Sequence, residues 1–190
     1  RFVAQLNKIV EAKMLFCNSW SRGENAKNNM RLMRRQADEW GLPQDYLIFT
    51  SEMGSEWENG VPQKVVRDMY WIGNLFIMPS ISETFSLAMA EAAACKNFLV
   101  LNEDLTVFHE LAGDDAEYVG FGAHWGGQRI ERDYKPNAEQ FLMDRARELV
   151  EKFRATKPLQ MHRKVLRRFN REWVFKNQLE PLILGENRSG

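Results

Sequence analysis

The chain has 190 residues, 44% of them hydrophobic and 27% charged, which is typical of a globular domain with a substantial core. Lysine plus arginine equals aspartate plus glutamate at 26 each, so the net charge of zero does not indicate general nucleic-acid binding. Two cysteines exclude a disulfide scaffold, and Glu91 and Lys96 interrupt the longest apolar stretch, which excludes a transmembrane segment. We expect a cytoplasmic protein. Because the chain begins with Arg1 rather than Met, the possibility of a targeting segment upstream stays open.

Short apolar runs alternate with amphipathic segments along most of the chain. The runs predict buried strands at 13–18, 46–50, 74–80, 97–102 and 116–121. Helices are predicted at 26–40, 62–72, 85–95, 106–111 and 137–154, and the tail is predicted as helices 158–170 and 171–184. Asn25 is expected to cap the first of these helices, Pro62 to begin the second, and residues 120–127 to form a glycine-rich loop.

This alternation predicts a doubly wound, Rossmann-like parallel sheet of five or six strands. We expect residues 1–12 to be a leader from a preceding segment, 13–157 to be the Rossmann-like domain, and 158–190 to be C-terminal helices. Ligands of such sheets bind beyond the carboxyl ends of the strands. The loops that this rule selects are 18–25, 51–61, 79–86 and 102–106.

Loop 79–86 leads from a predicted strand into a predicted helix. The first amides of that helix, from Phe85, Ser86 and Leu87, are expected to be unpaired and to suit a phosphate. A carboxylate at Glu91 could accept hydrogen bonds from both hydroxyls of a ribose, and Glu83 lies where a sugar on the far phosphate would be. The alternatives are a polar cap for Glu83 and a solvent-facing side chain for Glu91. A glycosidase pair fits less well, because eight helical positions span roughly 12 Å.

The stretch PSISETFSLAMAEAAACKNFLVL, residues 79–101, resembles the donor-binding half of GT-B glycosyltransferases. It is most similar to the large retaining family that includes sucrose synthases and bacterial mannosyltransferases. That family has Pro-Ser, a short gap, Glu-Gly-Phe-Gly-Leu, then Glu-Ala-Met-Ala-x-Gly before a Val-Val strand. The matching residues are Pro79, Ser80, Glu83, Phe85, Leu87, Glu91, Ala92, Ala94, Leu99 and Val100.

A second match lies after the first predicted strand. The family has Gly-Arg with a lysine five residues after the arginine, and SRGENAKNN places Arg22 and Lys27 at that spacing. An arginine and a lysine beside a helix N-terminus would neutralise a diphosphate as it leaves. The sequence departs from the family where Thr84 and Ser86 replace two glycines, where Lys96 replaces another, and where Leu105-Thr106 stand in place of Gly-Gly.

The resemblance implies retaining transfer of a sugar from a UDP- or GDP-linked donor to an unidentified acceptor. Arg22, Lys27 and Glu83 would be catalytic, and Glu91 with residues Thr84, Phe85, Ser86 and Leu87 would bind the nucleotide sugar. The mechanism it implies needs no metal or other cofactor. The acceptor would lie on a separate N-terminal domain, so this chain is expected to bind donor without transferring sugar alone.

Two other functions remain open at this stage. A GT-B epimerase would turn over free donor without an acceptor, and a non-catalytic interaction module would bind no nucleotide. The basic stretch MHRKVLRRFNREW is predicted as a solvated helix face rather than a site for nucleic acid or an acidic acceptor. The tail residues Trp173, Val174 and Leu182 are expected to be partly exposed.

Overall fold

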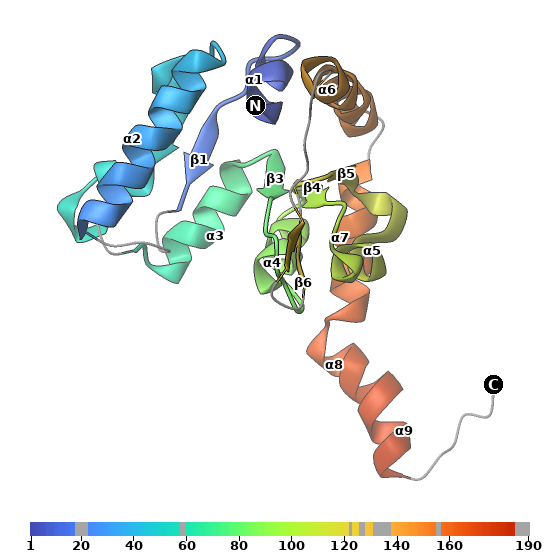
Figure 1. Ribbon diagram of the computed structural model, residues 1–190. Coiled ribbons are helices and arrows are strands. Elements are labelled where there is room, and N and C mark those ends of the chain that lie inside the picture. Colours follow the sequence, from blue (N-terminus) through green and yellow to red (C-terminus); the bar gives the residue numbers. More distant parts are fainter. Residues whose placement is uncertain are drawn as a thin grey trace. The chain divides into compact units, whose positions relative to one another are not determined.

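The computed structural model describes residues 1–17, 23–57, 60–121, 123–125, 128–130, 138–154 and 157–184. The chain forms two compact units, which are Arg1–Ile72 with Asp133–Arg154 and Gly73–Arg132 with Ala155–Gly190. Each unit contains parallel strands and helices (Figure 1), so the predicted α/β class with parallel sheets is confirmed.

The first unit contains the predicted strands near residues 13–18 and 46–50. Its elements are α1 (Phe2–Asn7), β1 (Met14–Phe16), α2 (Gly23–Glu39), β2 (Leu47–Phe49), α3 (Gln63–Ile72) and α6 (Ala138–Arg154), with short 3₁₀ turns η1 (Gln44–Tyr46), η2 (Thr50–Glu52) and η3 (Ser55–Trp57). Strands β1 and β2 are parallel, with Phe16 opposite Phe49. These two rings stack with centroids 4.8 Å apart, which adds a side-chain contact to the backbone ladder.

Residues 1–12, expected as a leader, contain the buried helix α1. Phe2 and Leu6 are 5% and 1% exposed, and α1 contacts α6 (Figure 1). On α6 the predicted apolar face is buried at Leu142, Ala146 and Leu149. The side chains of α1 therefore belong to the core of the first unit.

Helix boundaries in the first unit differ in part from the expectation. Helix α2 begins at Gly23, so the prediction of Asn25 as its N-cap is wrong; Asn25 lies in the first turn. Helix α3 begins at Gln63, and Pro62 precedes it while accepting from the amides of Val65 and Val66. The expected stop after α2 is confirmed, because Gly41 takes φ +73° and Leu42 N donates to Ala37 O at 2.8 Å.

The second unit is built on a three-stranded parallel sheet in the order β3-β4-β5. Its elements are β3 (Leu75–Met78), α4 (Leu87–Ala94), β4 (Phe98–Asn102), α5 (Thr106–Ala112), η4 (Gly113–Asp115), β5 (Glu117–Val119), β6 (Ala123–Trp125), β7 (Gln128–Ile130), α7 (Lys157–Arg168), α8 (Arg171–Val174), the π-helical η5 (Phe175–Leu179) and α9 (Glu180–Ile183). Every residue of the central strand β4 is buried. Helices α4 and α7 contact this strand and each other.

Strands β6 and β7 form an antiparallel pair, with Trp125 opposite Gln128. The prediction of a loop over 120–127 is therefore wrong for residues 123–125. Each of these strands has only three residues, which is too short for a pattern of apolar residues to predict it. The described strands thus form one two-stranded and one three-stranded parallel sheet plus this pair.

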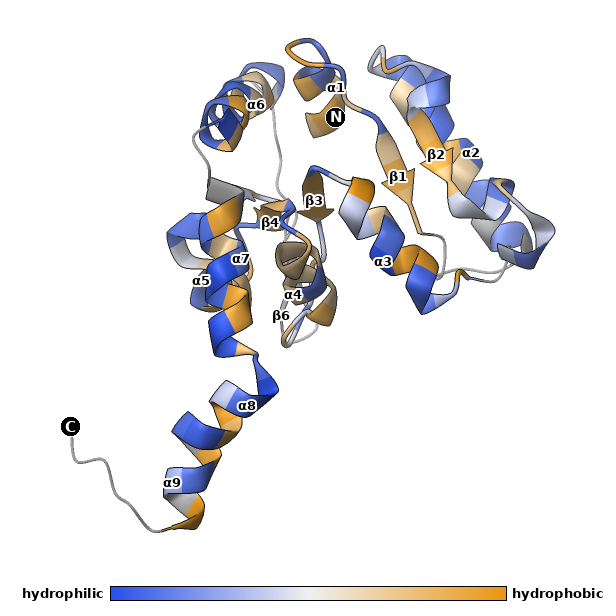
Figure 2. Cartoon of the chain, turned by 180° about the vertical axis from the view of Figure 1, so that it is seen from behind, coloured by the Kyte–Doolittle hydropathy of each residue, from blue (hydrophilic) through white to orange (hydrophobic). Residues whose placement is uncertain are grey.

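The C-terminal helices follow the predicted division near residue 170. Asn170 caps α8, because its side chain accepts from Trp173 N at 2.9 Å. Figure 2 shows hydrophobic and hydrophilic residues alternating along α7, α8 and α9. Trp173 is 41% exposed and Val174 is half-buried, as expected, while the side chain of Leu182 lies outside the described part.

Candidate functional site

The carboxyl ends of β3, β4 and β5 meet at one edge of the second unit's sheet, because the three strands are parallel. Loop 79–86 follows β3, residues 103–105 follow β4, and residues 120–121 follow β5. Two of the loops that the sequence selected for ligand binding, 79–86 and 102–106, therefore lie at the same edge. In open α/β sheets this is the edge where ligands bind.

Glu83 binds backbone amides of its own loop. Its Oε1 accepts hydrogen bonds from Thr84 N and Ser86 N, each at 3.2 Å. The two amides thus converge on one carboxylate oxygen, which is the arrangement that binds anions in backbone nests. Of the three amides that the sequence assigned to phosphate, the one from Ser86 has Glu83 as its partner in this structure.

Ser86 joins this loop to α4 in an unusual backbone conformation. It has φ 61° and ψ 77°, in the left-handed region, and its Oγ accepts from Met89 N at 3.3 Å. A residue at positive φ cannot continue a right-handed helix. Helix α4 therefore begins at Leu87, two residues after the predicted start at Phe85.

Helix α4 ends in a second left-handed residue, Lys96, with φ 67°. Lys96 N donates to Ala93 O and Asn97 N donates to Ala92 O, both at 3.0 Å. These two bonds form a Schellman motif, which normally has glycine at the left-handed position. Ser86 and Lys96 are the non-glycine residues with positive φ in the part of the chain that the structure describes.

Glu91 lies on the exposed side of α4. It is one turn after Leu87, which is 69% exposed, whereas Met89, Ala92 and Ala93 are fully buried on the other side. Among the described residues, no hydrogen bond or ion pair involves the carboxylate of Glu91. Both glutamates of this apolar stretch thus avoid an unpaired buried charge, Glu91 by exposure and Glu83 through two amides.

Phe85 lies between the two glutamates in sequence and is 37% exposed. Its ring packs edge-on against Phe169, which follows α7, with centroids 5.3 Å apart. Thr84 is exposed. The predicted binding residues of the second unit, Glu83 to Leu87 and Glu91, thus lie along the loop after β3 and the first turns of α4.

Asn102 is a residue of this edge that the sequence analysis missed. It is fully buried at the end of β4, and its Nδ2 donates to Ser80 O at 2.8 Å. Its Oδ1 accepts from Asp104 N at 3.1 Å and from Phe121 N at 3.0 Å. One side chain thus connects the loops that follow β3, β4 and β5.

The loop after β4 differs from the family pattern at Leu105-Thr106. Leu105 is 5% exposed and points into the core, while Thr106 is exposed as the first residue of α5. On the same helix, His109 Nε2 lies 2.9 Å from Glu103 O, and its ring stacks on Tyr118 with centroids 4.2 Å apart. These contacts hold the start of α5 against β5.

Tyr118 supports this part of the edge through its hydroxyl. The hydroxyl donates to Gly113 O at 2.8 Å and lies 3.2 Å from Phe108 O. Burial raises the pKa of Tyr118 above its usual value, and the carboxylates of Asp114 and Asp115 raise it further. The phenol therefore stays protonated and remains a donor across the neutral pH range.

One of the two predicted cations, Lys27, lies in the described part of the first unit. Lys27 lies in the exposed part of α2, near the ion pair of Glu24 with Arg31 at 3.1 Å. Arg22 lies outside the described residues. The structure thus groups Glu83, Thr84, Phe85, Ser86, Leu87 and Glu91 in the second unit, and Lys27 in the first.

Within the described ranges, no group of three or more histidine, cysteine, aspartate or glutamate residues is arranged to hold a metal ion. No helix in those ranges has both the length and the apolar character of a membrane span. Compared with known proteins, the chain matches no family model and no curated sequence.

Proposed function

We propose that this chain is the donor-binding half of a retaining GT-B glycosyltransferase, with a doubly wound, Rossmann-like core, and that it binds a nucleoside-diphosphate sugar. The observation that carries the proposal is the pair of left-handed residues, Ser86 and Lys96. Both stand where the family pattern has glycine. A backbone that keeps the glycine conformation after losing the glycine supports the alignment independently of side-chain identity.

The converging amides of Thr84 and Ser86 support a phosphate at the start of α4. They bind an anionic oxygen, which Glu83 supplies in this structure. A phosphate oxygen would replace that carboxylate and keep both hydrogen bonds. The displaced Glu83 would then be able to accept hydrogen bonds from hydroxyls of the donor sugar.

Glu91 is assigned to the ribose of the nucleotide. Its exposed position on α4 lets the carboxylate accept from two adjacent hydroxyls without first breaking another contact. Phe85 and Leu87 would cover the apolar surface of the nucleotide between the glutamates. Arg22 and Lys27 remain sequence-based predictions for the diphosphate, and the proposal is based on the second unit alone.

The reaction would break the bond between the sugar C1 and the phosphate oxygen. A new bond would form between C1 and an acceptor hydroxyl with the configuration at C1 kept, and the acceptor proton would leave with the diphosphate. The protein's contribution would be to hold the donor and to stabilise the charge that develops on the leaving diphosphate.

The test is isothermal titration of the chain with UDP, GDP and ADP. We expect one of them to bind, and Glu91→Ala to weaken that binding at least about tenfold, because charge-assisted hydrogen bonds contribute about 1.5 to 3 kcal/mol each. Glu110→Ala is the matched control, since Glu110 is also an exposed helical glutamate of the second unit. Absence of binding by all three nucleotides would favour the non-catalytic interaction module.

A further inference from the structure

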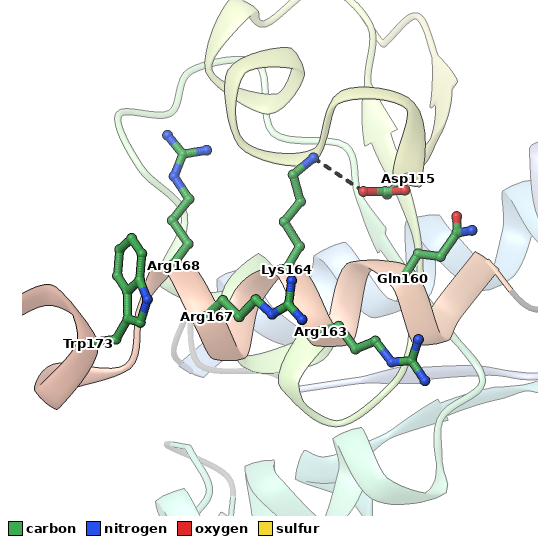
Figure 3. Close-up of a pocket in the computed structure, with 7 residues that line it drawn as sticks. All are labelled: Asp115, Gln160, Arg163, Lys164, Arg167, Arg168 and Trp173. Atoms are coloured by element: carbon green, nitrogen blue, oxygen red, sulfur yellow. Dashed lines mark hydrogen bonds and ion pairs between the residues drawn. The ribbon is translucent and has the colours of Figure 1, made fainter. Parts of the chain in front are cut away.

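A hollow of about 590 Å³ lies along α7 in the second unit. Its walls include Arg163, Lys164, Arg167 and Arg168 of α7, together with Asp115 and Trp173 (Figure 3). The sequence favoured a solvated face for this basic stretch. The structure adds a shallow depression in which Trp173 lines the same space as the cations, and a simple solvated helix face does not require this.

Positive charge is concentrated in this part of the chain. Residues 155–171 contain six lysines and arginines and no aspartate or glutamate, although the whole chain has 26 residues of each sign. The charge of the chain is thus segregated, with one cationic segment in a neutral protein. Such a segment can attract polyanions even though the net charge of the whole chain is zero.

Two of the four α7 cations in the hollow are already engaged. Lys164 Nζ lies 3.2 Å from Asp115 Oδ2 and donates to Ala112 O at 2.7 Å. Arg168 donates to Glu110 O at 3.1 Å. Arg163 and Arg167, which are one helical turn apart, have no hydrogen-bond or ion-pair partner within the described residues. Their guanidinium groups remain available to bind phosphates.

Trp173 supplies an aromatic surface to the same hollow. It is 41% exposed, and the cap from Asn170 to Trp173 N fixes the start of the helix that carries it. An exposed indole beside guanidinium groups offers a platform on which an unpaired base can stack. Arginine fits phosphate geometry through its two parallel N–H groups.

We propose that this hollow is a binding site for single-stranded nucleic acid, with phosphates on Arg163 and Arg167 and a base on Trp173. A duplex fits less well, because its bases are stacked on one another and cannot reach the indole. An acidic peptide would use the cations but not the aromatic surface. An anionic bilayer would attract the same cations but needs an apolar face to insert, whereas the aromatic surface of this hollow is a single indole.

The test is fluorescence anisotropy of the 190-residue chain with labelled oligothymidylate and oligouridylate of about 12 nucleotides, a length within the usual range for such sites. We expect binding of at least one strand that weakens between about 50 and 200 mM salt. The double variant Arg163→Ala/Arg167→Ala should lower the magnitude of the log–log salt slope by about 1.4, since each phosphate contact on a single strand contributes about 0.7.

Trp173→Ala should weaken binding by about 5- to 150-fold, as expected for loss of one stacked base, without changing the salt slope. Trp173→Phe keeps a ring and should recover part of the loss. The control is Arg67→Ala/Arg147→Ala, which removes the same charge from two exposed, ion-paired arginines of the first unit. Circular dichroism of each variant would check that it is folded.

The alternatives are distinguished by competitors. Poly-glutamate and vesicles containing phosphatidylserine should displace the strand poorly. Equal or tighter binding of poly-glutamate would assign the hollow to acidic polypeptides, and binding of vesicles in preference to the strand would assign it to a lipid surface. Either result would overturn the proposal, as would an equal loss in the control double variant or no binding of either strand.

Discussion

Asn102→Ala should destabilise the second unit more than its small change in volume suggests. Among the described residues, the buried amide makes hydrogen bonds of 2.8, 3.1 and 3.0 Å to backbone groups in three different loops. At about 1 kcal/mol net for each bond, the loss is about 3 kcal/mol. For a chain of this size that corresponds to a fall in Tm of roughly 6 to 12 °C.

Thermal unfolding followed by near-ultraviolet circular dichroism measures this loss, and urea unfolding gives the free energy independently. The control is Asn74→Ala, because Asn74 is an exposed asparagine at the other end of the same sheet. Asn102→Asp keeps two acceptor contacts but loses the donor to Ser80 O and buries a charge. If Asn102→Ala lost no more stability than Asn74→Ala, the reasoning that this side chain connects the three loops would be refuted.

Three further predictions concern other parts of the chain. Replacing both Arg22 and Lys27 with Ala should weaken binding of the nucleoside diphosphate far more than binding of the nucleoside, measured by titration; equal losses would indicate a structural role for both. Lys96→Gly should raise the unfolding free energy by about 0.5 to 1 kcal/mol, because glycine adopts the left-handed conformation without strain, whereas Lys96→Ala should show no such gain. Tyr118 has a raised pKa in the folded chain, so its contribution to stability is complete below the unfolded value of 10.0 and is lost as the pH rises above it. Tyr118→Phe should therefore show a smaller alkaline loss in urea unfolding, and identical alkaline profiles would contradict this assignment.

The regular elements were predictable because their signals are local. Continuous apolar runs predicted strands at β3 and β4, and Gly41 marked the stop after α2. The conformation of Ser86 was not predictable, because a serine N-cap normally has an extended backbone. Here the amide of Ser86 is drawn to Glu83, and the resulting left-handed turn moves the helix start to Leu87.

The role of Asn102 could not be predicted from the sequence for a different reason. Its partners are 22, 2 and 19 residues away, so only the parallel pairing of three strands brings the two distant ones to its side chain. A polar residue at a strand end gives no signal of this role by itself. The hollow along α7 could not be predicted either. The sequence shows its charges but not the turn at Asn170 that places Trp173 beside them.

The alanines of α4 set a limit on which side chains this helix can carry. Ala92 and Ala93 are fully buried, α7 contacts α4, and His162 Nδ1 lies 3.3 Å from Ala93 O. A side chain larger than the methyl group of Ala93 would therefore have to displace its buried surroundings, of which α7 is a part. A bulkier residue there would alter the position of Arg163, Arg167 and Trp173 without replacing any residue of the cationic hollow itself.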